Sequence, residues 1–304
     1  MAQPTQVLAT LSPSDRAALT MRSDRAGLIH LAGHGGLIAA LMTYVAMGLP
    51  LWWVAMVPLG IALAFLFTLQ HECTHLTPFK TRALNELAGH ACALVLIQPF
   101  LWFRAFHMAL HKHTNDPDQD PELHGDAKPE TWAAFVWHLS SLGYWGHKAQ
   151  TLWFNAIGNI DPAYVSQLAR TCVRKEARVL IAIYTLVALF TVTISPILIW
   201  VWLMPLVIGF PVLRLYLLAE HGRCPSVANM FENSRTTLTN RFVRFLAWNM
   251  PYHAEHHAYP NVPFHKLPTA HAVAKAHLGT ISDGYASFTI EYTRDLNGTA
   301  GGAS

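Results

Sequence analysis

The chain has 304 residues, of which 52% are hydrophobic and only 13% are charged, and its formal net charge is +3. So small a positive charge, with no basic run interleaved with aromatic residues, argues against a nucleic-acid-binding protein. The apolar composition, together with a mean hydropathy of only +0.26, predicts a membrane anchor that carries a large water-exposed part.

Two long apolar stretches follow in chain order. The first, residues 28–70, contains no charged residue and is broken near Gly48-Leu49-Pro50. The second, residues 179–218, is broken near Ser195-Pro196 and contains one charged residue, Arg214, close to its end. About 20 helical residues span the roughly 30 Å of a hydrocarbon core. The sequence therefore predicts an all-α membrane protein with four transmembrane helices in two hairpins.

Two segments between the hairpins also have membrane character. The apolar run 87–103 is long enough for a span, but a single crossing would separate the histidines on its two sides. We therefore expect this run to lie at the membrane interface and to return. The tryptophan-rich segment 131–160 fits either an interfacial segment, because amphipathic rings favour the headgroup level, or an ordinary aromatic core.

The orientation follows from the basic residues, which precede the first hairpin and lie between the two hairpins, while both hairpin tips are uncharged. Because cytoplasmic segments are enriched in Lys and Arg, both termini should face the cytosol. We expect one polytopic domain, residues 1–304, with a cytosolic helical cap formed by residues 71–178 and 219–285. The small polar tail, residues 293–304, is predicted to be disordered.

Histidine is unusually frequent, at 18 residues, and it gathers at the ends of the apolar stretches. On a helix, residues four apart share a face, so two such histidines can reach one metal ion. The clustered histidines are His71 and His75 in HECTH, His107, His111 and His113 in HMALHKH, His221 in AEHG, and His253, His256 and His257 in HAEHH.

Three glutamates lie inside these clusters, and we expect them to orient the ring N–H groups of the ligands. They are Glu72, Glu220 and Glu255. The remaining histidines of the apolar and aromatic segments are expected to be ordinary packed residues. They are His30, His34, His90, His138 and His147.

The number of clustered histidines indicates the kind of metal site. Neutral imidazole binds Zn, Cu, Fe and Ni, and a structural zinc site takes only four ligands. Eight or nine candidates favour two metal ions with open positions for dioxygen, and iron suits the cleavage of an unactivated C–H bond. A metal transporter or a haem-binding membrane protein is a remote alternative, because the spans contain almost no ionisable residue at mid-depth.

In these motifs the chain resembles the membrane fatty acid desaturase superfamily, which includes related hydroxylases and carotenoid ketolases. The resemblance covers residues 29–278. It rests on HECTH (71–75), FRAFHMALHKHTNDPDQDPEL (103–123), LAEHG (218–222), NSRTT (233–237) and MPYHAEHHAYPNVPFHKLP (250–268).

The resemblance implies two non-haem iron ions at the cytosolic face, with dioxygen as co-substrate and a long-chain acyl lipid as the substrate to be desaturated. It also implies a separate electron-transfer protein of the ferredoxin, rubredoxin or cytochrome type. Hydroxylation or ketolation of a lipid, alkane or carotenoid remains an alternative on the same scaffold. The implied ligands are His71, His75, His107, His111, His221, His253, His256 and His257.

One motif departs from the family pattern. The second histidine motif of the family usually reads HxxHH, which would place a histidine where this chain has Leu110. Either the site has one ligand fewer, or His113 takes the vacant position.

Overall fold

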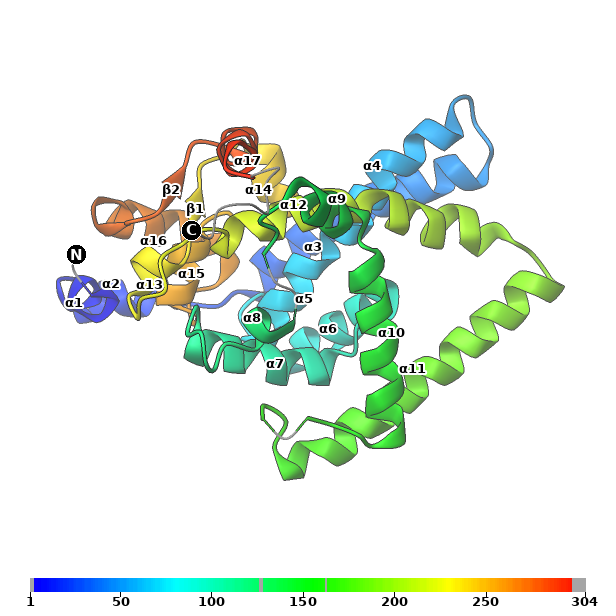
Figure 1. The fold of residues 1–304 in the computed structure, drawn as a ribbon, viewed down its shortest axis with the longest axis horizontal. Helices are drawn as coiled ribbons and strands as arrows, with labels where there is room; N and C mark the ends of the chain where they lie inside the picture. The colour runs from blue at the N-terminus through cyan, green and yellow to red at the C-terminus, as the bar shows by residue number, and fades with distance from the viewer. Residues whose placement is uncertain (1–2, 126–127, 162, 297–304) are drawn as a thin grey trace, which may run out of the picture. The chain divides into compact units, whose positions relative to one another are not determined.

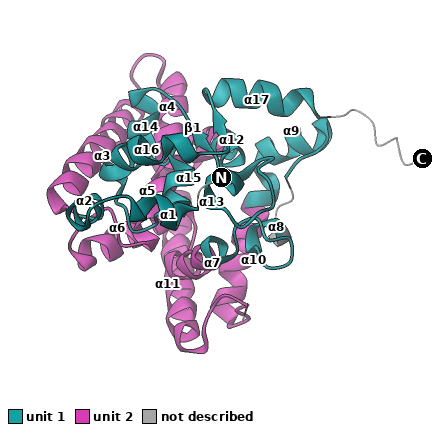
Figure 2. Cartoon of the chain, turned by 90° about the vertical axis from the view of Figure 1, so that its left-hand side faces the viewer, with its two compact units in different colours: residues 1–22, 110–144, 214–304 teal, residues 23–109, 145–213 magenta. Residues whose placement is uncertain are grey.

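The structure is a computed structural model that describes residues 3–125, 128–161 and 163–296. It consists of helices, with one pair of two-residue strands among the described residues, and so confirms the predicted all-α class (Figure 1). The chain forms two compact units, shown in different colours in Figure 2. Unit 1 is residues 1–22, 110–144 and 214–304, and unit 2 is residues 23–109 and 145–213.

Unit 2 contains most of the long apolar helices. Its elements are α3 (Asp24–Ala46), α4 (Trp52–Ala64), α5 (Leu66–Thr74), α6 (Arg82–Leu96), α11 (Gln167–Thr193) and η1 (Ile199–Leu203), with the greater part of α7 (Phe100–His113), α10 (Leu142–Ile157) and α12 (Met204–His221).

Among the described residues, four helical stretches are long and apolar enough to cross a membrane, as predicted: Pro13–Ala46, Trp52–Thr74, Gln167–Thr193 and Ile199–His221. The third begins at Gln167 rather than near residue 179. Ser166 caps this helix by accepting a hydrogen bond from the backbone N–H of Ala169, which satisfies one of the exposed donors of the first turn. The helix therefore includes a charged section before its apolar part.

Helices α4 and α12 meet backbone to backbone. A Cβ atom on Gly60 would lie 1.9 Å from the carbonyl oxygen of Pro205, and one on Gly209 would lie 2.0 Å from the carbonyl carbon of Gly60. No side chain fits at either position, so glycine is required for this close helix contact.

Helices α6 and α7 are bent by 102° at a short break. Ile97 ends α6 with a left-handed backbone conformation (φ 54°), and the carbonyl oxygen of Gln98 accepts a hydrogen bond from Nε2 of Gln70 at 3.0 Å. The apolar run 87–103 is therefore broken by a sharp bend. That it lies at the membrane interface and returns stays a prediction.

The tryptophan-rich segment contains α9 (Trp132–Ser140) and α10. Trp132, Trp137 and Trp153 are all exposed. Of the two interpretations left open by the sequence, this exposure favours an interfacial segment, since rings in an aromatic core would be buried.

Unit 1 is built from short elements. They are α1 (Pro4–Ala9), α2 (Pro13–Leu19), α8 (Pro121–Gly125), α9, α13 (Met230–Asn233), β1 (Thr236–Thr237), α14 (Arg241–Leu246), α15 (His253–Ala258), η2 (Phe264–Lys266), α16 (Leu267–Ala274), η3 (Lys275–His277), β2 (Ile281–Ser282) and α17 (Tyr285–Arg294). Strands β1 and β2 pair in parallel, with Thr236 opposite Ile281. Thr236 also forms a bridge to Tyr252, which fixes the chain just before α15.

Two expectations about organisation stay predictions. The single domain is not tested by the division into compact units. The predicted disordered tail begins inside α17, which runs to Arg294, and residues 297–304 lie outside the described residues.

Candidate metal centre

Unit 2 brings three of the predicted ligands together. His71 lies in the last turn of α5, His75 directly follows that helix, and His107 lies on α7. The ring centroids of His71 and His107 are 4.1 Å apart, and Nε2 of His75 lies 2.9 Å from Nε2 of His107. Each ring offers a nitrogen within 4.8 Å of the others. We call these three residues the first triad.

Apolar packing supports the His107 ring of the first triad. Phe103 lies about one turn before His107 on α7 and stacks on its ring, with the centroids 5.6 Å apart. Phe103 itself is buried in a cluster with Trp102, Val165 and other apolar residues. Stacking and helix packing therefore limit the orientations open to the His107 ring.

Glu72 lies within the HECTH motif and is fully buried. Its Oε2 atom accepts a hydrogen bond from the hydroxyl of Thr77 at 2.9 Å. The carboxylate therefore supports the turn that follows His75.

Unit 1 gathers a second set, which we call the second triad: His221, His253 and His257. His221 is the last residue of α12, and the other two lie on α15. Nε2 of His253 lies 3.0 Å from Nε2 of His221, and the ring centroid of His257 lies 4.4 Å from that of His253. All three rings are buried, and each offers a nitrogen within 4.8 Å of the others.

Polar neighbours select the tautomers of two of these rings. Nδ1 of His221 donates a hydrogen bond to the backbone carbonyl oxygen of Asn233 at 3.3 Å. Nδ1 of His253 lies 3.3 Å from a carboxylate oxygen of Glu220. A carbonyl oxygen can only accept, so the bond to Asn233 favours a His221 ring protonated at Nδ1, and the position of Glu220 is compatible with the same tautomer of His253. The two Nε2 atoms then present lone pairs to each other.

This arrangement fits a metal ion. Two lone pairs at such a separation repel each other unless a cation lies between them. Two imidazole nitrogens that bind one metal ion at about 2.1 Å are roughly 3.0 Å apart when the angle at the metal is near 90°, and roughly 3.4 Å apart at the tetrahedral angle. The Nε2 separations of 2.9 Å in the first triad and 3.0 Å in the second lie close to the shorter of these values.

His257 is held in the neutral form that metal binding requires. Burial, and then the neighbouring histidines His111 and His253, lower the pKa of His257 well below its usual value. Its Nδ1 atom lies 3.2 Å from the Thr114 hydroxyl, and its Nε2 atom has no hydrogen-bond partner among the described residues. The Nε2 lone pair is thus available to a metal ion.

The two remaining predicted ligands lie beside His257 in unit 1. His111 stacks on His257, with centroids 4.0 Å apart and planes inclined by 6°, and its ring is 5.1 Å from that of His256. His111 and His256 offer ring nitrogens within 4.8 Å of each other. Unit 1 therefore contributes five of the eight predicted ligands.

The possible replacement ligand, His113, lies apart from the other histidines. Among the described residues, it belongs to neither group of closely spaced ligand atoms, and Leu110, where the family pattern has a histidine, is buried. Glu255 is fully buried, and its two oxygens contact the hydroxyl of Thr236 and Nδ1 of His271. His271 lies outside the predicted ligand set.

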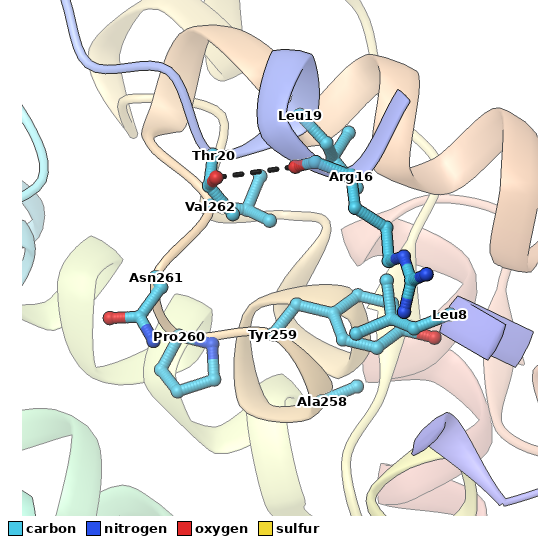
Figure 3. A pocket seen from close by; sticks show the side chains of 9 residues that line it. All are labelled: Leu8, Arg16, Leu19, Thr20, Ala258, Tyr259, Pro260, Asn261 and Val262. Carbon is cyan, nitrogen blue, oxygen red and sulfur yellow. Dashed lines mark hydrogen bonds between the residues drawn. The ribbon is translucent and has the colours of Figure 1, made fainter. Parts of the chain in front are cut away.

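A small cavity of about 200 Å³ lies beyond α15 (Figure 3). It is bounded by Leu8, Arg16 and neighbouring residues of α1 and α2 on one side and by the segment 258–262 on the other. Tyr259 lines it, and its hydroxyl donates a hydrogen bond to the carbonyl oxygen of Pro4 at 3.0 Å. The N-terminal helices thus pack on the segment that follows the HAEHH motif.

Two functional neighbours were not singled out by the sequence reasoning. Asn233 accepts from His221 through its carbonyl oxygen, and its Nδ2 atom donates to the carbonyl oxygen of Thr114 at 3.3 Å. Asn115 donates to the same Asn233 carbonyl oxygen at 2.7 Å. The available signals were position and context: Thr114 and Asn115 directly follow His113, and Asn233 opens the NSRTT motif.

The comparisons with known proteins agree with this geometry. A family model described as fatty acid desaturase matches residues 47–289, well over half of the chain. An sn-1 oleoyl-lipid 12-desaturase from Anabaena variabilis is 32% identical over 131 residues, which are 35% of this chain and 37% of that protein. This chain thus spans little more than a third of the length of that relative.

Two further relatives differ in coverage and in name. A dihydrorhizobitoxine desaturase from Bradyrhizobium elkanii is 29% identical over 73% of this chain and 68% of its own length. A protein named sn-1 acyl-lipid omega-3 desaturase (ferredoxin), from Nostoc sp. (strain 36), is 31% identical over 28% of this chain and 23% of its own length.

Proposed function

We propose that this chain, which belongs to the fatty acid desaturase family, binds two iron ions through its clustered histidines and desaturates the acyl chain of a membrane lipid. The observation that carries the proposal is the pair of histidine triads, in which ring nitrogens lie at the spacing of two ligands on one metal ion. His71, His75, His107, His111, His221, His253, His256 and His257 are the proposed ligands.

The composition of the ligand set supports two ions rather than one. Eight histidines exceed the four ligands of a structural zinc site. Neutral imidazole without cysteine is suited to iron among the redox-active metals. Bound iron would supply the activation of dioxygen, which no side chain of this protein can perform.

The residues of the chain bind, orient and exclude water. Glu220 and the carbonyl oxygen of Asn233 hold the protons of His253 and His221 on Nδ1, so that both Nε2 atoms face the metal position. Burial of the second triad keeps bulk water away from its three rings and strengthens the interactions of these dipoles. The substrate carbon would be oriented by packing rather than by polar contacts.

The choice of substrate rests on the names of the relatives and on the membrane fold. The Anabaena relative is named for an oleoyl lipid, and four apolar helices provide access to lipid acyl chains. The Bradyrhizobium relative is named for dihydrorhizobitoxine and matches more of the chain, so this compound is the second substrate to test.

A separate protein would supply the electrons. Among the four cysteines, Cys73 and Cys92 are buried, and the sequence contains no CxxC pair that could hold a cluster. We propose a ferredoxin, rubredoxin or cytochrome as donor, and the name of the Nostoc relative supports a ferredoxin. The basic segments flanking the spans support termini and an active site on the cytosolic side.

The test combines metal analysis with product analysis of the purified full chain. We expect two irons per chain and no haem absorbance, and a product that has lost two hydrogens from its acyl chain. A product that has gained one oxygen would instead establish a hydroxylase or ketolase. Haem, or zinc that iron cannot replace, would overturn the di-iron site and favour the haem-binding or transport alternatives.

A further inference from the structure

We propose that Glu176, in the charged section at the start of α11, is the positioning residue that fixes α7 and thereby sets the place of His107 in the first triad. The inference rests on the proposed function, because it assigns the orientation of one proposed iron ligand to a distant carboxylate. All residues involved lie in unit 2.

The carboxylate of Glu176 accepts two backbone hydrogen bonds from the first turn of α7. Oε1 accepts from the N–H of Phe100 at 3.0 Å, and Oε2 accepts from the N–H of Leu101 at 2.9 Å. Nδ1 of His90, on α6, lies 2.8 Å from Oε1. The Glu176 side chain is only 7% exposed. A buried carboxylate with three partners holds these atoms far more firmly than a surface ion pair would.

The start of α7 depends on this distant group because the local sequence provides no cap. The residue before Phe100 is Pro99, which has no side-chain oxygen to accept from the first-turn amides. The amides also carry the positive end of the helix dipole, which favours a negative charge at this point. Glu176 therefore replaces the missing cap from 75 residues away.

A second set of contacts transmits the position of the helix start toward His107. The guanidinium of Arg104 lies 4.4 Å from the centre of the Phe100 ring, and it donates to both carboxylate oxygens of Glu86 at 3.1 and 3.0 Å. A Cβ atom on Gly89 would lie 2.2 Å from the Phe100 ring, so α6 presses directly on this residue.

His107 follows Phe100 by seven residues, which is about 10 Å along a helix. Its Nε2 atom is 2.9 Å from Nε2 of His75, so a shift or rotation of α7 changes that separation directly. Release of the helix start should therefore weaken metal binding at the first triad, because the bonds of Glu176 fix the helix that carries His107.

The test measures two quantities separately, on the full chain in detergent: the protection of the α7 amides against hydrogen exchange, and the affinity for a metal ion. Hydrogen exchange of the Phe100 and Leu101 amides is followed in the metal-free protein, and Co²⁺ binding is followed by its visible absorbance. For Glu176→Ala we expect these two amides to exchange at least roughly ten times faster than in the wild type, and Co²⁺ to bind roughly ten times more weakly. Glu176→Gln, which keeps one good acceptor, should lie between this variant and the wild type.

Two further variants separate positioning from a general loss of stability. Thr185→Ala removes a hydroxyl on the same helix that bonds only within it, to the carbonyl oxygen of Ile181, and should change neither readout. In the Glu176→Ala background, Pro99→Asp supplies a local cap and should restore both protection and Co²⁺ affinity. This rescue also keeps the proposal testable if Glu176→Ala alone folds poorly.

Each step of the proposal has a result that would contradict it. Unchanged exchange in Glu176→Ala would show that the anchor does not protect α7. Faster exchange with unchanged Co²⁺ affinity would show that the helix start does not position His107. If the wild type binds neither Co²⁺ nor iron, the proposed function fails, while the exchange measurements still decide whether Glu176 anchors the helix.

Discussion

The two triads hold chemically identical ligands by different means. In the first triad the ring of His107 is stacked on Phe103, and the nearby buried carboxylate of Glu72 bonds a threonine. In the second triad, polar groups lie at Nδ1 of all three rings. The first triad therefore depends on the placement of helices, and the second depends on particular hydrogen-bonding groups. Mutations should separate these two kinds of support.

The largest effect is expected from the ligands themselves. His107→Ala in the first triad and His253→Ala in the second each remove one of three closely spaced nitrogens, and activity should fall at least roughly a hundredfold. Iron per chain, measured by elemental analysis, should decrease in both. His113→Ala is the control and should keep its iron, because His113 lies outside both groups. Iron loss in His113→Ala would identify it as the replacement for the missing ligand at Leu110.

The apolar support of the first triad is tested by Phe103→Ala. The buried ring stacks on His107 and fills a cluster with Trp102, so its removal should lower the free energy of unfolding by about 3–5 kcal/mol. Thermal denaturation of the metal-free protein measures this loss. Phe103→Leu retains most of the volume and should recover most of the stability. Equal destabilisation by both variants would point to the stacking geometry rather than to the filled volume.

The polar support of the second triad is tested by Glu220→Gln. An amide in place of the carboxylate weakens the preference of His253 for a proton on Nδ1, so iron affinity should fall about 10- to 100-fold. Glu72→Gln is the matched change in the first triad and should alter affinity much less, because Oε2 of Glu72 accepts a hydrogen bond from the Thr77 hydroxyl. Equal losses in the two variants would remove the proposed difference between the triads.

The smallest expected effect is a dependence of the free energy of unfolding of the metal-free protein on pH. The pKa of His257 in the folded state lies well below 6.5, the ordinary value that the unfolded chain retains. The unfolded state therefore takes up the proton first, and stability that is present above pH 6.5 is lost as the pH falls below it. The loss should be up to about 1.4 kcal/mol per pH unit for this one group.

Denaturation between pH 7.5 and 5 measures this slope. His257→Asn cannot titrate, so its stability should decline less steeply than that of the wild type as the pH falls. If stability falls equally steeply with pH in the wild type and in His257→Asn, groups other than His257 cause the pH dependence.

The sequence predicted those parts of the molecule that depend on local pattern. Uncharged stretches of about 20 residues identified the four apolar helices, and i, i+4 spacing identified His71 with His75 as neighbours on one helix face. Helix periodicity cannot reveal contacts between distant segments. Asn233 lies beside His221 through a turn of the backbone, and Thr114 reaches His257 across 143 positions of sequence.

Glu176 shows the same limit most clearly. In the sequence it lies within the run RKEAR, whose basic residues suggested only a cytosolic orientation. Its role becomes visible only when α11 is placed against the start of α7, where its carboxylate accepts from the first two amides. The contact between Glu176 and Nδ1 of His90 could not be inferred from either helix alone.

The uncapped start of α7 also orders events during synthesis. The amides of Phe100 and Leu101 are made 75 or 76 residues before the carboxylate that accepts their hydrogen bonds. At roughly 5–20 residues per second, several seconds pass before Glu176 is added to the chain. During that interval the first hairpin, with His71 and His75, has already been synthesised. His107 has also been synthesised, but the carboxylate that anchors its helix is added only with the beginning of the second hairpin. The first triad should therefore reach its final geometry only after that hairpin has begun to form.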